Sequence, residues 1–235
     1  MSGKKDAGGG SAGPETRRAA VRRQTRETRV EAVVALDGTG DAKVETGIGF
    51  LDHMLATLAR HARLDLSLSC KGDLGTDDHH TAEDCSLALG EAVDRALGDR
   101  RGIARFGSAV APLDEALARA VVDLSGRPFA VVDLGLRREA IGGLSCENIP
   151  HVIRSFATAA RATVHVDVLR GENDHHRTEA AFNLLPPADR EASILTQSGA
   201  SARSRAAAPG SPPRTSSARA ASDRCCGCGN APCRC

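Results

Sequence analysis

The chain has 235 residues, long enough for one large domain or two small ones, and 41% of them are hydrophobic, which is enough for a buried core. It has no Trp, no Tyr and five Phe, so Leu, Val and Ala must fill most of that core. A net charge of +1 gives no reason to expect nucleic acid or an anionic membrane as a partner. No apolar run approaches the roughly 18 residues of a membrane span.

The two ends of the chain differ in composition from the middle. Residues 1–26 begin with a polar, Gly-rich stretch that lacks the apolar segment of a signal peptide, and we expect a disordered leader. Five of the eight cysteines lie in the last eleven residues, and Cys70, Cys85 and Cys146 are scattered. This is no disulfide framework for the whole fold, and it indicates a reducing, cytoplasmic location.

The middle of the chain predicts the same order of elements twice. The first copy contains an expected strand at 27–38, helix at 50–61 and strand at 63–69, and the second contains a strand at 115–126, helix at 148–159 and strand at 163–169. A turn with Gly follows in each copy, and a second helix then begins. The first copy covers 27–114 and the second 115–185. We therefore expect an α+β fold of duplicated strand-helix-strand-helix half-domains, related by a pseudo-twofold axis, with sheets packed against helices.

The composition changes again after Leu185. Residues 186–235 are rich in Ser, Ala, Arg and Pro, which predicts a disordered tail. Pro186 and Pro187 are expected to cut the last helix short. The cysteines of the tail offer a second interpretation, a zinc-binding segment, but CCGC…CRC lacks a firm two-pair spacing.

The second helix of each copy begins with His-His-x-x-Glu. In TDDHHTAED the motif supplies His79, His80 and Glu83, and on a helix the glutamate is expected near both histidines. Adjacent helical residues diverge by about 100°, so His79 and His80 suit two different ions. The motif returns in ENDHHRTEA as His175, His176 and Glu179.

A further histidine precedes each motif. His53 lies 26 residues before His79, and His151 lies 24 residues before His175. Together the two copies offer six imidazoles and two carboxylates, or three His and one Glu per metal. Such mixed ligands suit Mn, Fe(II), Co, Ni or Zn, and open coordination positions favour an octahedral ion such as Mn.

Other residues carry weaker signals. Arg105 and Arg127 follow Gly-containing turns, where they could bind an anion or form surface ion pairs. His61 ends the first expected helix, where it could simply bind terminal carbonyls. His165 lies on the polar face of its strand, and Glu27 stands at the start of a strand.

Several long motifs resemble the imidazoleglycerol-phosphate dehydratase family between about Glu27 and Phe182. The motifs are TGIGFLDHMLATLARH, GDLGTDDHHTAEDCSLALGEA, ALGDRRGIARFGSAVAPLDEALA, VDLSGRPF and GENDHHRTEAAF. The resemblance implies a duplicated α+β unit, a shell of twenty-four chains built from trimers, and two Mn²⁺ ions per active site with ligands drawn from neighbouring chains. It also implies a homo-oligomer without nucleic acid or membrane partners.

The resemblance also assigns roles to residues. Metal ligands would be His53, His79, His80, Glu83, His151, His175, His176 and Glu179. Catalytic roles would fall to Glu27, Glu83 and Glu179. Substrate contacts would come from Glu27, His53, His61, His79, Arg105, Arg127 and His175, with His61 and the two arginines on the phosphate.

The implied reaction is the dehydration of D-erythro-imidazole-glycerol phosphate to imidazole acetol phosphate in histidine biosynthesis. The proton to be removed lies on a carbon without an adjacent carbonyl, so the imidazole ring must act as the electron sink. The resemblance implies that this occurs through a dimetal-bound imidazolate.

The end of the chain departs from the family pattern. Asn183 stands where the family has Lys, and the Ser and Lys that the family's C-terminus contributes to the phosphate have no counterpart in SARSRAAAPG. An altered reading frame or a misjudged splice would explain the abrupt change. All eight metal ligands are present but about half of the phosphate contacts are not, so impaired activity is expected.

Two alternatives to an active dehydratase follow from the same residues. One is a metal-binding protein without a catalytic role, such as a storage shell or an inactive relative. The other, a dimetal hydrolase, is disfavoured because six imidazoles with two carboxylates are rich in His for phosphoester hydrolysis and no bridging Asp is evident. The presence of Glu27, Arg105 and Arg127 favours the dehydratase over storage.

Overall fold

A computed structural model describes residues 17–194, with side chains described as far as Leu184. The first sheet has the order β1-β2-β4-β3. Its strands are β1 (Arg18–Gln24), β2 (Arg29–Ala35), β3 (Ala42–Glu45) and β4 (Asp65–Lys71). Helices α1 (Gly49–Ala62) and α2 (His79–Leu97) belong to the same half of the chain.

The second half repeats this connectivity. Its sheet has the order β5-β6-β10-β7, formed by β5 (Phe106–Leu113), β6 (Ala116–Asp123), β7 (Phe129–Asp133) and β10 (Thr163–Arg170). Its helices are α3 (Asn148–Ala159) and α4 (Asp174–Ile194), and a small hairpin of β8 (Ala140–Ile141) and β9 (Leu144–Ser145) precedes α3. In each sheet two of the three strand pairings are antiparallel and the third is parallel. The two halves are therefore topologically equivalent. This agrees with the duplication expected from the sequence.

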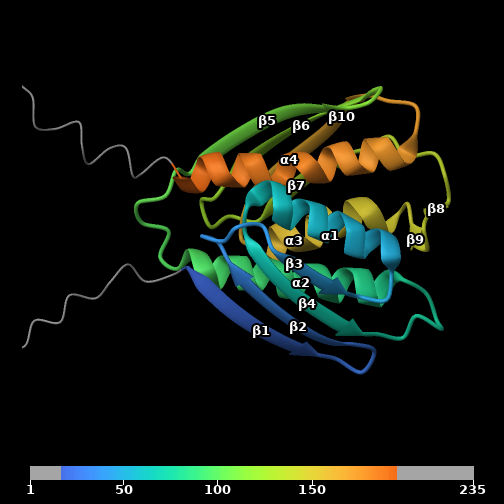
Figure 1. Ribbon diagram of the computed structural model, residues 1–235, viewed down its shortest axis with the longest axis horizontal. Coiled ribbons are helices and arrows are strands. Elements are labelled where there is room, and N and C mark those ends of the chain that lie inside the picture. The colour runs from blue at the N-terminus through green and yellow to red at the C-terminus, as the bar shows by residue number, and fades with distance from the viewer. Residues whose placement is uncertain (1–16, 195–235) are drawn as a thin grey trace, which may run out of the picture. The chain divides into compact units, whose positions relative to one another are not determined.

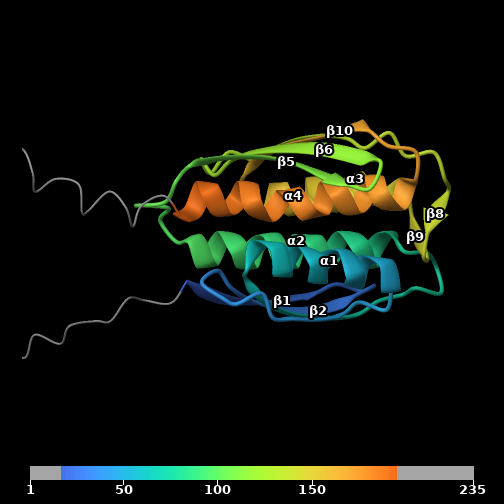
Figure 2. The ribbon, with the colours of Figure 1, turned by 45° about the horizontal axis from the view of Figure 1, so that its top comes forward.

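The helices lie between the two sheets (Figures 1 and 2). Helix α2 packs on β1 and β2, helix α4 packs on β5 and β6, and the two halves meet where α2 contacts α3 and α1 contacts α4. Gly90 allows the α2–α3 approach, because a Cβ there would lie 2.5 Å from the carbonyl oxygen of Phe156. The helix apolar faces expected from the sequence are confirmed as core, for example Leu51 and Met54 in α1 and Ile149 and Ile153 in α3.

Several expected boundaries were wrong. The strand β1 lies inside the segment 1–26 that was expected to be a disordered leader, and β5 belongs to the second sheet although it precedes residue 115. The short strands β3 and β7 were not expected. Each half therefore begins one strand earlier than expected. The sequence repeat did not include β1 and β5, because these two strands have little similarity to each other.

The last helix was also expected to be shorter. Helix α4 continues through Pro186 and Pro187 to Ile194. Residues 1–16 and 195–235, which include most of the expected tail and its cysteines, lie outside the described residues, so the zinc-binding and frame-change interpretations are not addressed by the structure. No helix within residues 17–194 has the length and apolar character needed to cross a bilayer.

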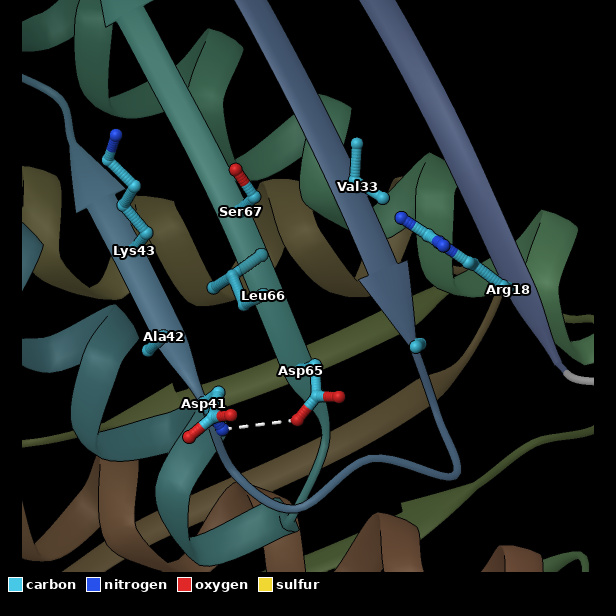
Figure 3. Close-up of a pocket in the computed structure, with 9 residues that line it drawn as sticks. Arg18, Val33, Asp41, Ala42, Lys43, Asp65, Leu66 and Ser67 are labelled. Carbon is cyan, nitrogen blue, oxygen red and sulfur yellow. Dashed lines mark hydrogen bonds between the residues drawn. The ribbon is translucent and has the colours of Figure 1, made fainter.

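The outer faces of the two sheets differ in chemistry at equivalent positions. On the second sheet the row Ser108–Val121–His165–Val131 crosses all four strands, and Phe106 and Phe129, 62% and 61% exposed, lie on the next row. On the first sheet the equivalent row is Ala20–Val33–Ser67–Lys43. A shallow hollow on that face is lined by Arg18, Asp41, Lys43 and Asp65 among others (Figure 3), and none of the expected site residues lines it.

Candidate metal centre

Two clusters of two histidines and one glutamate form where the helices of the two halves meet. In the first cluster, His79 Nε2 lies 4.0 Å from Glu83 Oε2, and His151 Nε2 lies 3.3 Å from Glu83 Oε1. We call His79, Glu83 and His151 triad A. Their possible ligand atoms all lie within 4.8 Å of one another.

The second cluster has the same composition. His175 Nε2 lies 3.2 Å from Glu179 Oε2, and His53 Nε2 lies 3.6 Å from Glu179 Oε1. We call His53, His175 and Glu179 triad B, and its ligand atoms also lie within 4.8 Å of one another.

Each triad combines residues from both halves of the chain. Triad A takes His79 and Glu83 from α2 and His151 from α3, and triad B takes His175 and Glu179 from α4 and His53 from α1. The α2–α3 and α1–α4 contacts therefore bring the ligands together. Neither half alone contains a complete triad.

The first turns of α2 and α4 are held by similar local contacts. The carboxylate of Asp77 accepts a hydrogen bond from His79 N, and the amide oxygen of Asn173 accepts one from His175 N, both at 2.9 Å. Asp78 accepts hydrogen bonds from the backbone and hydroxyl of Ser145 at 2.7 and 2.8 Å. Asp77 and Asn173 thus bind backbone N–H groups that have no partner within the helix. Asp78 instead connects the start of α2 to β9.

Asp174, the first residue of α4, precedes its His-His pair as Asp78 precedes the pair that begins α2. It is 2% exposed, and its Oδ2 accepts hydrogen bonds from Arg137 N and Arg138 N at 2.8 and 2.7 Å. The loop that leads to the β8–β9 hairpin is thereby fastened to the start of α4. Asp78 and Asp174 thus have equivalent positions before the two His-His pairs. Each binds a different part of the segment between β7 and α3.

The two triads differ in what orients their first histidine. His79 Nδ1 lies 2.9 Å from Oδ1 of Asn148, which is 4% exposed, so a proton on Nδ1 leaves the Nε2 lone pair directed toward triad A. At the equivalent place in triad B stands Phe50, whose ring centroid lies 5.0 Å from that of His175. One imidazole is fixed by a hydrogen bond and the other by packing.

The remaining pair, His80 and His176, belongs to neither triad. His80 Nδ1 lies 3.0 Å from Asp73 Oδ2, and this hydrogen bond raises the pKa of His80. The expectation that Glu83 would lie near both histidines of its motif was therefore correct for His79, whereas His80 turns to Asp73. As expected for adjacent helical positions, the two rings diverge, with centroids 6.0 Å apart.

His176 has an equivalent acidic partner from a different element. Its Nδ1 lies 2.7 Å from Glu115 Oε2 in the β5–β6 turn, and this hydrogen bond raises the pKa of His176. Backbone donation from Asn173 is the largest cause that lowers the pKa of Glu115 to about 2, followed by the hydrogen bond with His176. In both pairs the acid binds Nδ1, which directs Nε2 away from that acid, and Nε2 of His176 also lies 3.7 Å from Asp114 Oδ2.

Glu27 lies in the exposed β1–β2 turn, near enough to His80 to raise its pKa. The turn is fastened to α2 through Asp84, whose carboxylate accepts hydrogen bonds from Thr28 and Arg23. Within one chain, the charge of the glutamate expected to be catalytic thus acts on a histidine of the first motif.

Residues expected to hold phosphate lie elsewhere. Arg105 donates to both oxygens of Asp123 at 2.6 and 2.9 Å, and Arg127 donates to the same carboxylate at 3.3 Å. His61 is exposed in the last turn of α1. The loop between α2 and β5, whose last residue is Arg105, lies at the end of the molecule opposite to the first turns of α2 and α4 (Figure 1).

The donors of both triads fit a divalent transition metal. Two imidazole nitrogens and one carboxylate oxygen are a mixed set that suits Mn, Fe(II), Co, Ni or Zn and that leaves coordination positions free for other ligands. The partners of His79, His80 and His176 are the kind that orient metal-binding imidazoles. Sequence reasoning missed Asn148, Asp73 and Glu115 in this role, because polar residues in turns and at helix starts carry no signal of a histidine partner.

Comparisons with known proteins identify the family of the chain. The family model of imidazoleglycerol-phosphate dehydratase matches residues 46–188, which is more than half of the chain. The chain is 57% identical to the imidazoleglycerol-phosphate dehydratase of Neurospora crassa, over 76% of this chain and 89% of that protein. It is 60% identical to the enzyme of that name from Phytophthora nicotianae, over 75% of this chain but only 39% of the longer relative.

A solved structure gives the same answer for the fold. The imidazoleglycerol-phosphate dehydratase of Staphylococcus aureus superposes with a TM-score of 0.68 at 32% identity, covering 75% of this chain and 98% of that one. Similarity of this extent, in sequence and in fold, covers both halves and the elements that carry both triads. The chain therefore belongs to the imidazoleglycerol-phosphate dehydratase family, whose members are hydro-lyases.

Proposed function

We propose that this protein dehydrates D-erythro-imidazole-glycerol phosphate to imidazole acetol phosphate in histidine biosynthesis, with Mn²⁺ held by the two triads. The observation that carries the proposal is the pair of equivalent His-Glu-His triads, each assembled from both halves of the chain. A substrate whose ring has two nitrogens matches a protein that offers two similar ligand sets. The free thiols of Cys70, Cys85 and Cys146 support a cytoplasmic location.

The reaction requires an electron sink and positioned proton carriers. Bound Mn²⁺ would act as a Lewis acid on the imidazole ring and orient it. Glu83 and Glu179 each lie within 4.0 Å of both histidines of their triad, and Glu27 offers a carboxylate on an exposed turn, where its charge contributes to the raised pKa of His80. We assign to Glu27 the transfer of the substrate proton, because an exposed carboxylate near the ligands can accept and release it.

Eight metal ligands are proposed, and six of them are the residues of the two triads. His80 and His176, the other two proposed ligands, belong to neither triad. The Nδ1 atom of each lies at hydrogen-bond distance from an acidic side chain, which supports a role for its Nε2 as a ligand to a metal in another chain. With three imidazoles and one carboxylate per ion, each centre would need one histidine beyond the triad. A neighbouring copy of the chain is the proposed source.

The position of the phosphate residues also favours a homo-oligomer. A chain of contacts joins Arg105 to the end of α2. Asp94 of α2 pairs with Arg100, and Arg100 donates a hydrogen bond to Leu124 O. Leu124 N in turn donates a hydrogen bond to Arg105 O. Asp94 lies eleven residues beyond Glu83 on α2, or about 16 Å at 1.5 Å per residue. Arg105 therefore lies too far from triad A for both to contact one substrate of this size, and a second copy would have to bring its arginines to the site.

The apolar outer face of the second sheet is the surface that we propose for this association. Phe106, Val121, Phe129 and Val131 are each 39–62% exposed there. Arg105 stacks on Phe106 with its guanidinium carbon 4.7 Å from the ring centroid, so the face borders a proposed phosphate residue. The equivalent face of the first sheet is largely polar, which indicates that this apolar character is not simply a consequence of the fold.

The test is turnover of imidazoleglycerol phosphate by the purified 235-residue chain with and without added Mn²⁺, with metal content measured in parallel. Turnover that needs the metal would support the proposal, and the same chain with Glu83→Gln is expected to lose it. A chain that binds about two ions without turnover would instead be a metal-binding relative with no catalytic role. Turnover that persists in metal-free protein would contradict the proposed use of the triads.

A further inference from the structure

A buried carboxylate lies directly beside a proposed metal ligand without facing the metal. Asp84 follows Glu83 in α2 and is 6% exposed, and it points toward the β1–β2 turn. A buried carboxylate is costly unless it is well paired. Here burial alone would raise the pKa of Asp84, but hydrogen bonds from Thr28 and Arg23 hold that pKa below its usual value.

The partners of Asp84 all belong to one hairpin. Arg23 Nε donates to Oδ1 at 2.6 Å, and the hydroxyl groups of Thr25 and Thr28 lie at hydrogen-bond distance from Oδ2. Thr28 is 4% exposed, so its hydroxyl is buried together with the carboxylate. One charged group of α2 thereby binds both the end of β1 and the start of β2.

The same network reaches the backbone of Glu27. Thr25 Oγ1 accepts hydrogen bonds from Glu27 N at 3.2 Å and from Thr28 N at 3.0 Å, and the same hydroxyl donates to Asp84. Only Thr25 separates Asp84 from the Glu27 amide. The side chain of Glu27 is exposed, so its position depends on how firmly this short turn is held.

The second half of the chain shows that this anchor is not a general requirement of the fold. The residue after Glu179, equivalent to Asp84, is Ala180, which is buried. The β5–β6 turn is held instead by Glu115, which accepts hydrogen bonds from Glu172 N and Asn173 N at 3.1 and 2.8 Å. Glu115 thus uses its own carboxylate as the anchor. The Glu27 carboxylate accepts no hydrogen bond from residues 17–184, and its turn is anchored by Asp84.

We infer that Asp84 is a positioning residue that fixes the Glu27 carboxylate relative to His80 and triad A, an inference that rests on the dehydratase function proposed above. A catalytic group displaced by about 1 Å can lose a hundredfold in rate. Separating the anchor from the acid leaves Glu27 free to exchange a proton with substrate while its backbone stays in place.

The experiment compares Asp84→Asn, Thr28→Val and Thr28→Ser in the metal-loaded full-length chain, with Asp94→Asn as the matched control. Asp94 lies on the same helix and pairs with an arginine, Arg100, but does not contact the turn. We expect Asp84→Asn and Thr28→Val to lower kcat roughly 10- to 100-fold with KM changed less than about threefold. Thr28→Ser, which keeps the hydroxyl, and Asp94→Asn should stay near the unsubstituted rate, and metal content should be constant.

A double-mutant cycle tests whether Asp84 acts through Glu27. In a Glu27→Gln background, Asp84→Asn should cost less than about threefold, because residues that act through one another are not additive. Additive losses, or an equal loss in Asp94→Asn, would overturn the inference. Thr28→Val serves the same cycle if Asp84→Asn does not fold.

Hydrogen exchange separates this inference from the proposed function. The amides of Glu27 and Thr28 should exchange at least about tenfold faster in Asp84→Asn than in the unsubstituted chain or in Asp94→Asn, whether or not the protein turns over substrate. Unchanged exchange would show that Asp84 does not hold the turn, even if the chain is an active dehydratase. Faster exchange in a chain without any turnover would leave the anchor supported and would reject the proposed reaction instead.

Discussion

His79 of α2 and His151 of α3 stack, with ring centroids 4.9 Å apart and ring planes inclined by 17°. The two residues come from different halves of the chain, and their Nε2 atoms both approach Glu83. Triad B joins α4 to α1 in the corresponding way. A metal in either triad would therefore link the two halves, so that binding and the stability of the fold are coupled.

The coupling predicts a clear effect of His151→Ala. We expect this variant to lose tight binding at triad A, to retain about one Mn²⁺ per chain, and to gain less thermal stability from Mn²⁺ than the unsubstituted protein. Metal analysis after gel filtration and a melting curve with and without Mn²⁺ would measure both quantities. Thr158→Ala is the control, because Thr158 is exposed on the same helix two turns beyond His151, and its hydroxyl donates a hydrogen bond to Arg154 O.

The hydrogen bond between Asn148 and His79 predicts unequal triads. Asn148→Ala should weaken Mn²⁺ binding at triad A about 10- to 100-fold, since partners that orient metal-binding imidazoles typically have effects of this size. Titration calorimetry would resolve the two classes of site. Phe50→Leu, at the equivalent position, should change triad B less, and equal effects of the two substitutions would argue against orientation by Asn148.

The contrast between local and distant contacts explains what the sequence could predict. Periodicity identified α1, α3 and four central strands. The doubled motif identified four of the six residues that form the triads, and the histidine upstream of each motif supplied the other two. It could not identify β1 or β5 as outer strands, because their sequences differ and their place depends on pairing with β2 and β6. The sequence likewise could not show that Arg105 lies far from triad A. His79 begins α2 and Arg105 follows its end, so the length of this helix separates the two residues.

Residues that act through hydrogen bonds across the fold were the least predictable. Asn148, Asp73 and Glu115 reach histidines that lie 69, 7 and 61 residues away in the chain. Ordinary polar residues in turns and at helix starts carry no mark of such partners. Only the folded structure shows that each binds the Nδ1 atom of a histidine in one of the two motifs.

The outer face of the second sheet predicts a difference between two valines. Val121 and Val33 hold equivalent positions in the second and first sheets. Val121→Asp should shift the protein to smaller species in sedimentation or light scattering and lower turnover, because it places a charge in the proposed contact between copies. Val33→Asp should do neither, since Arg18 and Lys43 line the same hollow. If both variants assemble normally, the apolar face is not the contact surface.

We expect Asp65 to contribute to the loss of folding stability at low pH. Backbone donation from Thr39, then from Asp41, holds the pKa of Asp65 below its usual value (Figure 3). Because the folded-state pKa is depressed, the contribution of Asp65 to stability is present above its unfolded pKa of about 4 and is lost as the pH falls through the folded value. Melting temperatures measured between about pH 7 and pH 3 should fall less steeply for Asp65→Asn, which should also melt earlier at pH 7. Identical pH profiles would show that this carboxylate contributes nothing.

Asn183 offers a test of the phosphate contacts that the family resemblance implies. It lies four residues after Glu179, on the same side of α4, and its Oδ1 is buried without a hydrogen-bond partner among the described residues. The family resemblance places a lysine here, and one charged hydrogen bond is worth about 1.5 to 3 kcal/mol, or roughly 10- to 100-fold.

We therefore expect Asn183→Lys to raise kcat/KM by about that factor, mainly through a lower KM for the phosphorylated substrate. Asn183→Gln lengthens the side chain without a charge and should leave kcat/KM within about threefold of the unsubstituted value. A gain that falls with added salt would point to an ammonium–phosphate contact, because exposed charge pairs are screened. An equal gain in Asn183→Gln would mean that relief of the unpaired amide, and not the positive charge, improves the enzyme.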